Sequence, residues 1–188
     1  MLITGEPGSG KTTLGIDLSR AMQVPYIARD DVRAGLFCTA GAWTAQPGSA
    51  PSAEQAAETF LRIVETVAGL GVSCIVEYVV RGGRPNDLRR IETVANCVVL
   101  HTWCSEPLER FARRNEEDRL LNRRPVLDAL GYATIRDHTT DAVERMRSVA
   151  GEMRTDFDLP IMRVNTDDGY DPEMDRIVEF VAGVRSVR

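Results

Sequence analysis

The stretch Gly5-Glu6-Pro7-Gly8-Ser9-Gly10-Lys11-Thr12 near the amino end matches the phosphate-binding pattern G-x-x-x-x-G-K-[ST] in full. Its glycines allow a tight bend whose backbone N–H groups can surround a phosphate, and the helix expected after it adds the positive end of its dipole. Lys11 is the only lysine among 23 basic residues, so the one slim, flexible positive charge lies where the pattern requires it. The stretch predicts a nucleotide-binding loop between a strand and a helix.

The polar groups of this loop have separate expected tasks. Lys11 is expected to reach the β- and γ-phosphates of the nucleotide, and the Thr12 hydroxyl is expected to hold Mg²⁺. The residues that we expect to contact the nucleotide here are Gly8, Ser9, Gly10, Lys11, Thr12 and Thr13. The predicted cofactors are therefore ATP and Mg²⁺, and the alternative is a glycine-rich turn before an ordinary helix.

Composition is typical of a globular protein with a single domain over residues 1–188, since 43% of the residues are hydrophobic and 27% are charged. The net charge of -5 gives no basic surface for duplex nucleic acid, so the charge disfavours that partner. The four cysteines form no C-x-x-C pair, and we expect core thiols in a reducing compartment. No apolar run approaches about 20 residues, so we expect no membrane partner and a cytoplasmic location.

Short apolar runs alternate with amphipathic segments along the whole chain. Strands are expected at 2–4, 24–28, 72–80, 97–104 and 159–164, and helices at 12–22, 53–70, 85–95, 106–119, 139–154 and 172–184. A further short helix, capped by Asp30 or Asp31, is expected to end at Phe37. This order predicts an α/β fold with a doubly wound, parallel five-stranded sheet, helices on both faces, and ligands at the carboxyl ends of the strands.

Two segments without clear periodicity are expected to cover the site. Residues 38–52 are rich in Gly, Ala, Ser and Pro, which is typical of a long binding loop, and we place them on the acceptor side. Trp43 in this loop either covers a substrate or anchors the loop to the body of the protein. Residues of about 115–138 are expected to form a small helical lid.

The loop does not by itself say what happens to the terminal phosphate, and other motifs narrow the reaction. A guanine-binding N-K-x-D motif is excluded because the only lysine is Lys11. The strand at 72–80 carries one carboxylate, Glu77, rather than the Asp-Glu pair that activates water in motor ATPases. The sequence therefore disfavours ATP hydrolysis by such a pair. Phosphoryl transfer to a hydroxyl needs a carboxylate near the γ-phosphate, and Asp30 is the candidate base, with a structural helix cap as the alternative.

The loop together with Arg29-Asp30-Asp31-Val32-Arg33 resembles the phosphate loop and R-D-D-x-R motif of polynucleotide 5′-hydroxyl kinases. The wider group of P-loop kinases with this resemblance includes zeta-toxin-like and chloramphenicol-phosphotransferase-like enzymes. The resemblance implies a nucleoside-kinase-like P-loop fold in which Asp30 is the general base and Arg33 holds the acceptor. It also implies that Glu77 lies near the substrate or the metal, and we place Glu77 with Asp30 and Arg33 among the substrate-binding residues.

Arginines are concentrated between positions 110 and 124. Glu109-Arg110-x-x-x-Arg114 resembles the E-R-x-x-x-R motif of adenylate-kinase-like lids, which implies that Arg110 packs on adenine and Arg114 approaches phosphate. Arg119 and Arg123 are the candidates for stabilising the transferring phosphoryl group, although helix-surface ion pairs explain such arginines equally well. The loop at 165–172 resembles the segment that flanks adenine in these enzymes.

The sequence therefore predicts an ATP- and Mg²⁺-dependent phosphotransferase that acts on a hydroxyl of a small molecule or of a nucleic-acid end. Lys11, Asp30, Arg119 and Arg123 are its expected catalytic residues. Two alternatives stay open at this point: a regulatory ATP-binding module with little turnover, and a zeta-toxin-like kinase that acts on a nucleotide sugar.

Overall fold

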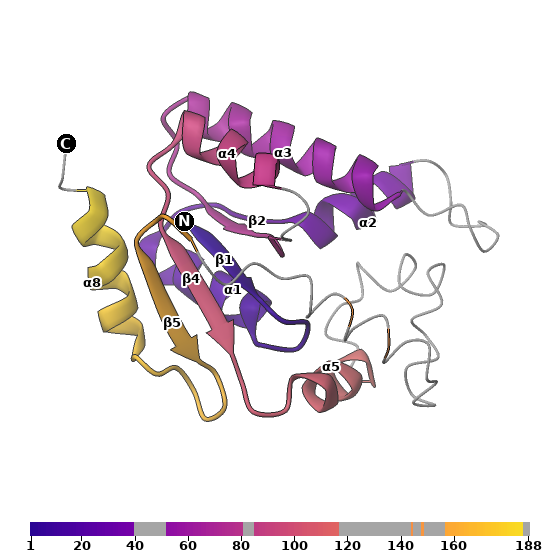
Figure 1. Cartoon of the computed structure of the whole chain (residues 1–188), viewed down its shortest axis with the longest axis vertical. Helices are drawn as coiled ribbons and strands as arrows, with labels where there is room; N and C mark the ends of the chain where they lie inside the picture. Colours follow the sequence, from indigo (N-terminus) through magenta and orange to yellow (C-terminus); the bar gives the residue numbers. More distant parts are fainter. Residues whose placement is uncertain (40–51, 81–84, 117–143, 145–147, 149–156, 186–188) are drawn as a thin grey trace.

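We describe a computed structural model of the chain, covering residues 1–39, 52–80, 85–116, 144, 148 and 157–185. Strands and helices alternate, as Figure 1 shows. In chain order they are β1 (Leu2–Gly5), α1 (Lys11–Met22), β2 (Tyr26–Ala28), α2 (Arg29–Thr39), α3 (Ala53–Gly69), β3 (Ile75–Glu77), α4 (Pro85–Val94), β4 (Val99–Trp103), α5 (Pro107–Glu116), β5 (Ile161–Asn165) and α8 (Met174–Arg185).

The five strands form one parallel sheet in the order β2-β3-β1-β4-β5. This confirms the predicted parallel five-stranded sheet. In the register of the sheet, Ile3 of β1 and Ala28 of β2 both lie opposite Glu77 of β3. The end of β3 is therefore level with the strand that enters the phosphate loop and with the strand that precedes the Asp30 motif.

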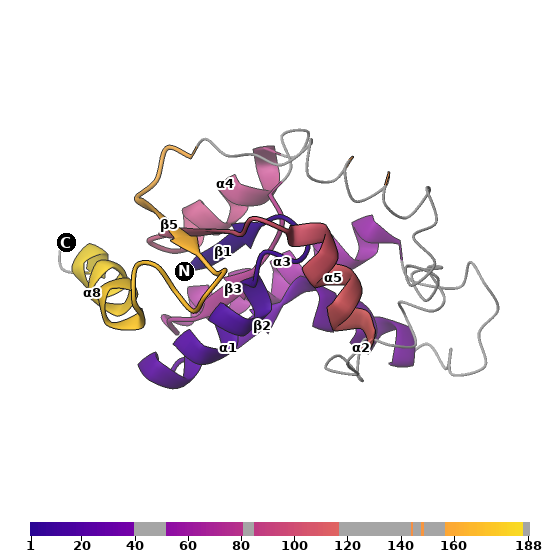
Figure 2. The ribbon, with the colours of Figure 1, turned by 90° about the horizontal axis from the view of Figure 1, so that it is seen from below.

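Two apolar clusters cover the two faces of the sheet. One joins the sheet to α3 and α4 and contains Phe60, Leu61 and Ile91, and the other joins it to α1 and α8 and contains Leu14, Leu18 and Ile177. Figure 2 shows α4 and α1 on opposite sides of the sheet. Strands covered on both faces need continuous apolar runs rather than alternating ones, which explains the pattern of the sequence.

Local signals in the sequence fix the ends of two helices. Ser52 caps α3 in a capping box: its hydroxyl accepts from the Gln55 backbone at 3.1 Å, while the Gln55 side chain accepts from the Ser52 backbone at 3.0 Å. Helix α1 begins directly after Gly10, whose φ of 81° few side chains tolerate, and ends at Met22, with Gln23 as its C-cap at φ of 54°. The phosphate loop thus leads straight into α1.

Several predicted boundaries differ from the structure. The strand expected at 72–80 is paired only over Ile75–Glu77, because an apolar run marks burial and not the extent of hydrogen bonding. Helix α2 begins at Arg29, so Asp30 and Asp31 lie in its first turn and neither is the expected cap. Their negative charges interact favourably there with the positive end of the helix dipole. The helix also continues to Thr39, so residues 38 and 39 of the predicted loop at 38–52 are helical, and residues 40–51 of that loop, Trp43 included, lie outside the described residues. The predicted lid at about 115–138 and the helix at 139–154 lie almost wholly outside the described residues.

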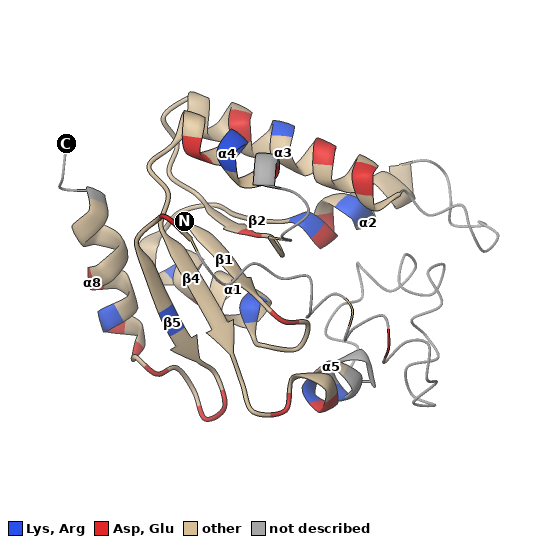
Figure 3. Cartoon of the chain, viewed as in Figure 1, with Lys and Arg blue, Asp and Glu red and all other residues tan. Residues whose placement is uncertain are grey.

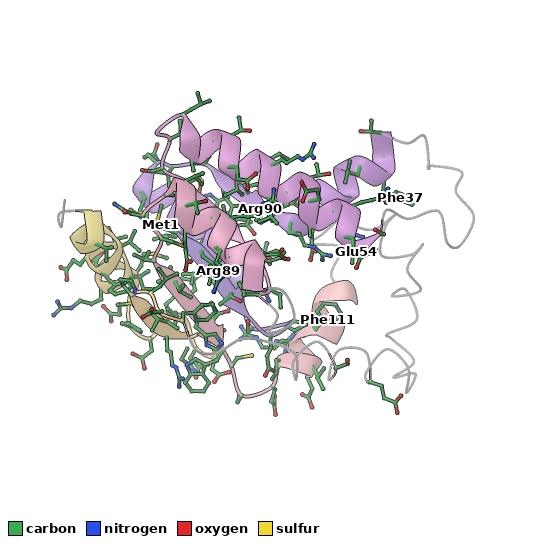
Figure 4. All side chains as sticks on the ribbon, turned by 45° about the horizontal axis from the view of Figure 1, so that its top comes forward. Met1, Phe37, Glu54, Arg89, Arg90 and Phe111 are labelled. Carbon is green, nitrogen blue, oxygen red and sulfur yellow. The ribbon has the colours of Figure 1, made fainter. Side chains whose placement is uncertain are left out.

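Charged side chains pack between α3 and α4 on the outer surface. Arg90 of α4 forms ion pairs with Glu58 and Glu65 of α3, with nitrogen–oxygen distances of 2.6 Å to each. Figure 3 shows acidic and basic residues close together on these two helices, and Figure 4 shows Arg90 beside α3. These hydrogen bonds from Arg90, more than any other influence, lower the pKa of Glu58 and of Glu65.

Three of the cysteines are buried as expected, Cys74, Cys97 and Cys104, while Cys38 is half-buried, and all four are free thiols. Burial raises the pKa of Cys74 and of Cys97, so both stay protonated at neutral pH. In the part of the chain that the structure describes, no helix combines the length and the apolar character needed to cross a membrane.

Candidate nucleotide and phosphoryl-transfer site

The residues predicted to act on the nucleotide come from the carboxyl ends of neighbouring strands. The phosphate loop follows β1, Glu77 ends β3, and Asp30 follows β2. Beyond the same edge, β4 leads into α5 and β5 leads into the segment that starts at Thr166. In Figure 1, α2 and α5 lie on either side of this edge. The topology therefore brings the predicted motifs to one end of the sheet, as expected for a parallel α/β fold.

The phosphate loop is packed so closely that none of its three glycines has room for a side chain, and Gly8 and Gly10 show this most clearly. Gly8 has φ of 86°, and a Cβ there would lie 1.8 Å from the carbonyl oxygen of Pro107 at the start of α5. Gly10 has φ of 81°, and its Cβ would lie 2.9 Å from Oγ1 of Thr166. Both the backbone conformation and the contacts require glycine, so α5 and the segment after β5 determine the shape of the loop.

Side chains of the loop are held in defined places. The Ser9 side chain is fully buried and its hydroxyl lies 2.7 Å from that of Thr102 in β4, while its backbone N–H donates to the Glu6 carbonyl oxygen at 3.0 Å, so Ser9 braces the loop from within. Lys11 donates from Nζ to the Glu6 carbonyl oxygen at 2.7 Å, which keeps its ammonium group within the loop. Thr13 is exposed at the start of α1.

Glu77 lies beside Thr12, the residue expected to hold the metal. The Thr12 hydroxyl donates to Oε1 of Glu77 at 3.2 Å, and the Tyr26 hydroxyl donates to Oε2. Glu77 is only 7% exposed, and among the described residues its hydrogen-bond partners are these two neutral hydroxyls. A buried carboxylate without a cation is costly, so a cation is expected beside it.

This donor set fits Mg²⁺. Magnesium prefers oxygen ligands and is usually held by one or two carboxylates together with substrate phosphates, rather than by a cage made only of protein groups. The described residues contain no group of three or more His, Cys, Asp or Glu that could hold a metal alone. Thr12 and Glu77 are therefore the residues that would hold Mg²⁺, with the nucleotide completing the site.

On the other side of the loop, Arg110 of α5 is linked to the loop through Thr166. Arg110 donates from Nη1 to the Thr166 hydroxyl at 2.9 Å, and this hydroxyl donates to the Ser9 carbonyl oxygen at 3.1 Å. The guanidinium group predicted to pack on adenine is thus held next to the phosphate loop. Arg114 lies one turn further along α5.

The segment after β5 is fixed by Asp167. Its carboxylate accepts from the Asn165 side chain at 3.0 Å and from the Ser105 backbone N–H at 3.0 Å. These hydrogen bonds, that of Asn165 first, lower the pKa of Asp167. The segment predicted to flank adenine is thereby tied to the end of β4.

Helix α2 carries the residues that we expect on the acceptor side. Asp30 lies in the first turn of this helix with its side chain 54% exposed, and Arg29 pairs with it at 3.1 Å. Arg29 also donates to the Ala53 carbonyl oxygen at the start of α3 at 3.4 Å, which joins the two helices. Arg33 is half-buried one turn further along. Asp30 and Arg33 thus share one end of α2, beyond the carboxyl end of β2.

His101 of β4 is half-buried, and no motif explains it. Both of its ring nitrogens are shielded from solvent, and in the described chain neither has a hydrogen-bond partner. Burial lowers the pKa of His101, and Arg163, opposite it on β5, lowers the pKa further, while Glu6 acts in the opposite direction. His101 is therefore neutral at pH 7.

The structure thus places most of the predicted site residues along one edge, while Arg119 and Arg123 lie outside the described residues. Sequence reasoning missed Tyr26, Thr102 and Thr166, whose hydroxyls fix Glu77, Ser9 and Arg110. Tyr26 and Thr102 lie within apolar strand runs, where a polar group signals a partner, but the sequence does not say which partner.

Solved structures with the same fold include several kinases. A Chloroflexus aurantiacus protein whose assignment as a kinase is provisional matches with a TM-score of 0.65 and 20% identity, over 97% of this chain and 96% of its own. A sugar kinase from Janibacter sp. matches with a TM-score of 0.60 and 16% identity, over 96% and 92% of the two chains. A gluconokinase from Sinorhizobium meliloti matches with a TM-score of 0.53 and 17% identity, over 98% and 90%.

At these identities, the three structures establish that the fold is shared. Among protein families, AAA_18, described as an AAA domain, matches residues 1–125, which include the phosphate loop, the Asp30 motif, Glu77 and α5. No curated protein matches the chain.

Proposed function

The chain belongs to the AAA_18 family of AAA domains, and we propose that it is an ATP-dependent, Mg²⁺-requiring phosphotransferase that moves the γ-phosphoryl group to a hydroxyl of a small molecule or of a nucleic-acid end. One observation carries the proposal: the buried Glu77 carboxylate, paired only with hydroxyls among the described residues, lies beside Thr12 of a complete phosphate loop. A single buried carboxylate at that place suits metal-assisted phosphoryl transfer.

In the proposed reaction the acceptor hydroxyl loses its proton to Asp30 as its oxygen forms a bond to the γ-phosphorus. The bond from that phosphorus to the bridging oxygen breaks, and ADP leaves with the electron pair. Lys11 and the loop N–H groups hold the phosphates and balance their charge. Thr12 and Glu77 would hold Mg²⁺, which would supply further positive charge to the phosphates.

Two observations bear on the class of acceptor, and each favours a different one. The R-D-D-x-R motif, Arg29 to Arg33, resembles that of polynucleotide 5′-hydroxyl kinases and their zeta-toxin-like relatives, which favours a phosphorylated or nucleotide-like acceptor held by Arg33. The structural neighbours that are a sugar kinase and a gluconokinase favour a polyhydroxylated small molecule. Arg119 and Arg123 of the predicted lid remain the candidates for stabilising the transferring phosphoryl group.

A transfer screen tests the proposal. The protein is incubated with labelled ATP and Mg²⁺ together with sugars, sugar acids, antibiotics, nucleosides, nucleotide sugars and 5′-hydroxyl oligonucleotides, and labelled products are separated from ATP. We expect label to move to one of these classes. Rapid ATP hydrolysis with no labelled acceptor would contradict the assignment as a kinase.

Asp30→Asn separates catalysis from binding. We expect ATP affinity to stay within a few-fold and transfer to fall by roughly 100-fold or more, the usual effect of removing an acid–base group. Asp31→Asn is the matched control, since it makes the same charge change one residue along the same helix turn and should retain most of the transfer rate. Equal rates for Asp30→Asn and the unmodified protein would favour a regulatory ATP-binding module instead.

A further inference from the structure

Tyr26, at the start of the edge strand β2, contacts Glu77, the carboxylate that lies beside Thr12. Its hydroxyl donates to Oε2 of Glu77, while Oε1 accepts from Thr12 at 3.2 Å. Tyr26 belongs to none of the motifs that predicted the site. We propose that Tyr26 is a positioning residue that orients the Glu77 carboxylate and so sets the Mg²⁺ concentration that nucleotide binding requires. This inference rests on the proposed function.

The ring of Tyr26 is fixed by its packing against α1, the helix that follows the phosphate loop. A Cβ at Gly15 would lie 2.3 Å from Cε2 and 2.9 Å from Cδ2 of this ring. Glycine at position 15 therefore leaves the space that the ring fills. An alanine is normally the more favourable residue inside a helix, so a glycine in the middle of α1 is consistent with a packing requirement. The ring, and with it the hydroxyl, has a defined position.

The chemical effect follows from the geometry of a carboxylate. The terminal torsion of a glutamate is broad, so neither oxygen has a fixed direction unless a partner holds it. The Tyr26 hydroxyl occupies Oε2, which keeps Oε1 directed at Thr12. A threonine hydroxyl has one proton and two lone pairs, so donating the proton to Oε1 leaves the lone pairs for a metal. Tyr26 thus keeps both oxygen ligands, those of Thr12 and Glu77, ready for the cation.

The charge of the site makes this orientation important. Glu77 is 7% exposed, and in the described part of the chain no lysine, arginine or histidine forms an ion pair with it. Hydrogen bonds to a charged group are stronger than those between neutral groups, so the Tyr26 hydroxyl contributes a large part of the hydrogen-bond energy that stabilises the Glu77 carboxylate. Without it, Glu77 keeps a single described partner, the same hydroxyl that the metal needs.

Tyr26→Phe tests the inference because it keeps the ring and removes only the hydroxyl. Binding of a nonhydrolysable ATP analogue is measured by isothermal titration calorimetry over a series of Mg²⁺ concentrations and again in EDTA. We expect the Mg²⁺ concentration that gives half of the maximal affinity gain to rise by roughly tenfold or more, as the loss of one hydrogen bond to a charged group predicts. Affinity in EDTA should stay within about twofold, because no loop residue has changed.

Tyr78→Phe is the matched control. Tyr78 follows Glu77 directly, and its hydroxyl also donates to a carboxylate, that of Asp87, but its ring packs on Phe60 in the cluster on the α3 and α4 face. Removing this hydroxyl should leave the Mg²⁺ dependence unchanged, and thermal unfolding compares the stability of the two variants. Gly15→Ala provides a second test, because it displaces the ring from the other side and should raise the Mg²⁺ requirement in the same direction.

The outcomes are distinct. Equal Mg²⁺ dependence in the unmodified protein and in Tyr26→Phe would overturn the inference alone, and so would a lower Mg²⁺ requirement in the variant. Equal increases in Tyr26→Phe and Tyr78→Phe would also overturn it, since the effect would then be a general loss of packing. If the unmodified protein binds the analogue without any Mg²⁺ effect, the proposed function fails together with the inference.

Discussion

Gly8→Ala tests whether the start of α5 determines the shape of the phosphate loop. The added Cβ would lie 1.8 Å from the carbonyl oxygen and 2.8 Å from the carbonyl carbon of Pro107. Real Cβ atoms essentially never approach other atoms more closely than 3.0 Å, so the loop and α5 must separate by about 1.2 Å. Position 8 also has φ of 86°, which costs an alanine about 1–2 kcal/mol.

The expected loss of nucleotide affinity follows from this displacement. A shift of about 1 Å takes a hydrogen bond from its optimum near 2.9 Å beyond the limit of useful geometry. Each hydrogen bond from the loop to a charged phosphate is worth about 1.5–3 kcal/mol. Losing two of them weakens ATP binding by at least about 100-fold, since about 1.4 kcal/mol corresponds to a factor of ten.

Isothermal titration calorimetry with ATP and Mg²⁺ measures this effect, and Gly183→Ala is the control. Gly183 lies in α8 and has nothing within 4 Å of an added Cβ, so its replacement should stabilise the helix by up to about 1 kcal/mol and leave ATP affinity unchanged. If Gly8→Ala binds ATP within about threefold of the unmodified protein, the close packing of α5 on the loop is refuted.

Three further predictions concern single residues. Arg110→Ala removes the group that joins α5 to Thr166, so calorimetry should find that ATP binds at least about tenfold more weakly. Arg113 is exposed on the same helix, and Arg113→Ala should bind ATP as the unmodified protein does. Equal affinities in the two variants would contradict the role of Arg110. Phe60→Ala removes a fully buried ring that stacks on Tyr78, so urea unfolding should show a free energy of unfolding lower by about 3–5 kcal/mol. A decrease below about 1 kcal/mol would contradict the observed packing. The lowered pKa of His101 means that the imidazole binds a proton more readily in the unfolded chain than in the folded one. Its contribution to stability is therefore complete above the unfolded pKa of about 6.5 and is lost as pH falls through the folded pKa. The decrease in unfolding free energy from pH 7.5 to pH 5 should be smaller in His101→Gln than in the unmodified protein, and an equal decrease would contradict this.

Patterns within short stretches of sequence were enough to predict the fold. The phosphate loop, the apolar runs and the capping residues each depend on neighbours within a few positions, and the parallel five-stranded sheet followed from their order. Helix ends with strong local signals, such as the start of α3 after Ser52, were placed to the residue. Strand ends were less certain, because burial continues beyond the last hydrogen bond, as at 72–80.

The helix that carries Asp30 shows a different limit. A single aspartate before an apolar segment is typical of a cap, but β2 leads into α2 without an intervening loop, so the helix begins at Arg29 and has no capping position for Asp30 to fill. Arg29 then forms an ion pair with the Asp30 carboxylate at 3.1 Å. The cap was wrong, and the catalytic role of Asp30 remains a prediction.

The hydroxyl groups around the loop could not be assigned from the sequence because their partners are distant in the chain. Thr12 meets Glu77 65 positions later, and Thr166 meets Ser9 157 positions earlier. Each pairing depends on which strands are neighbours and in which register, information that no local pattern contains. A threonine or tyrosine in an apolar run does indicate that a buried hydroxyl has a partner, since an unpaired one is costly. Combining that rule with the observed strand order would select Glu77, at the end of the strand between β1 and β2, as the acceptor for both Thr12 and Tyr26. The pairing of Thr12 with Glu77 can therefore be inferred once the sheet topology is known, whereas the sequence resemblance alone implied only that Glu77 lies near the substrate or the metal.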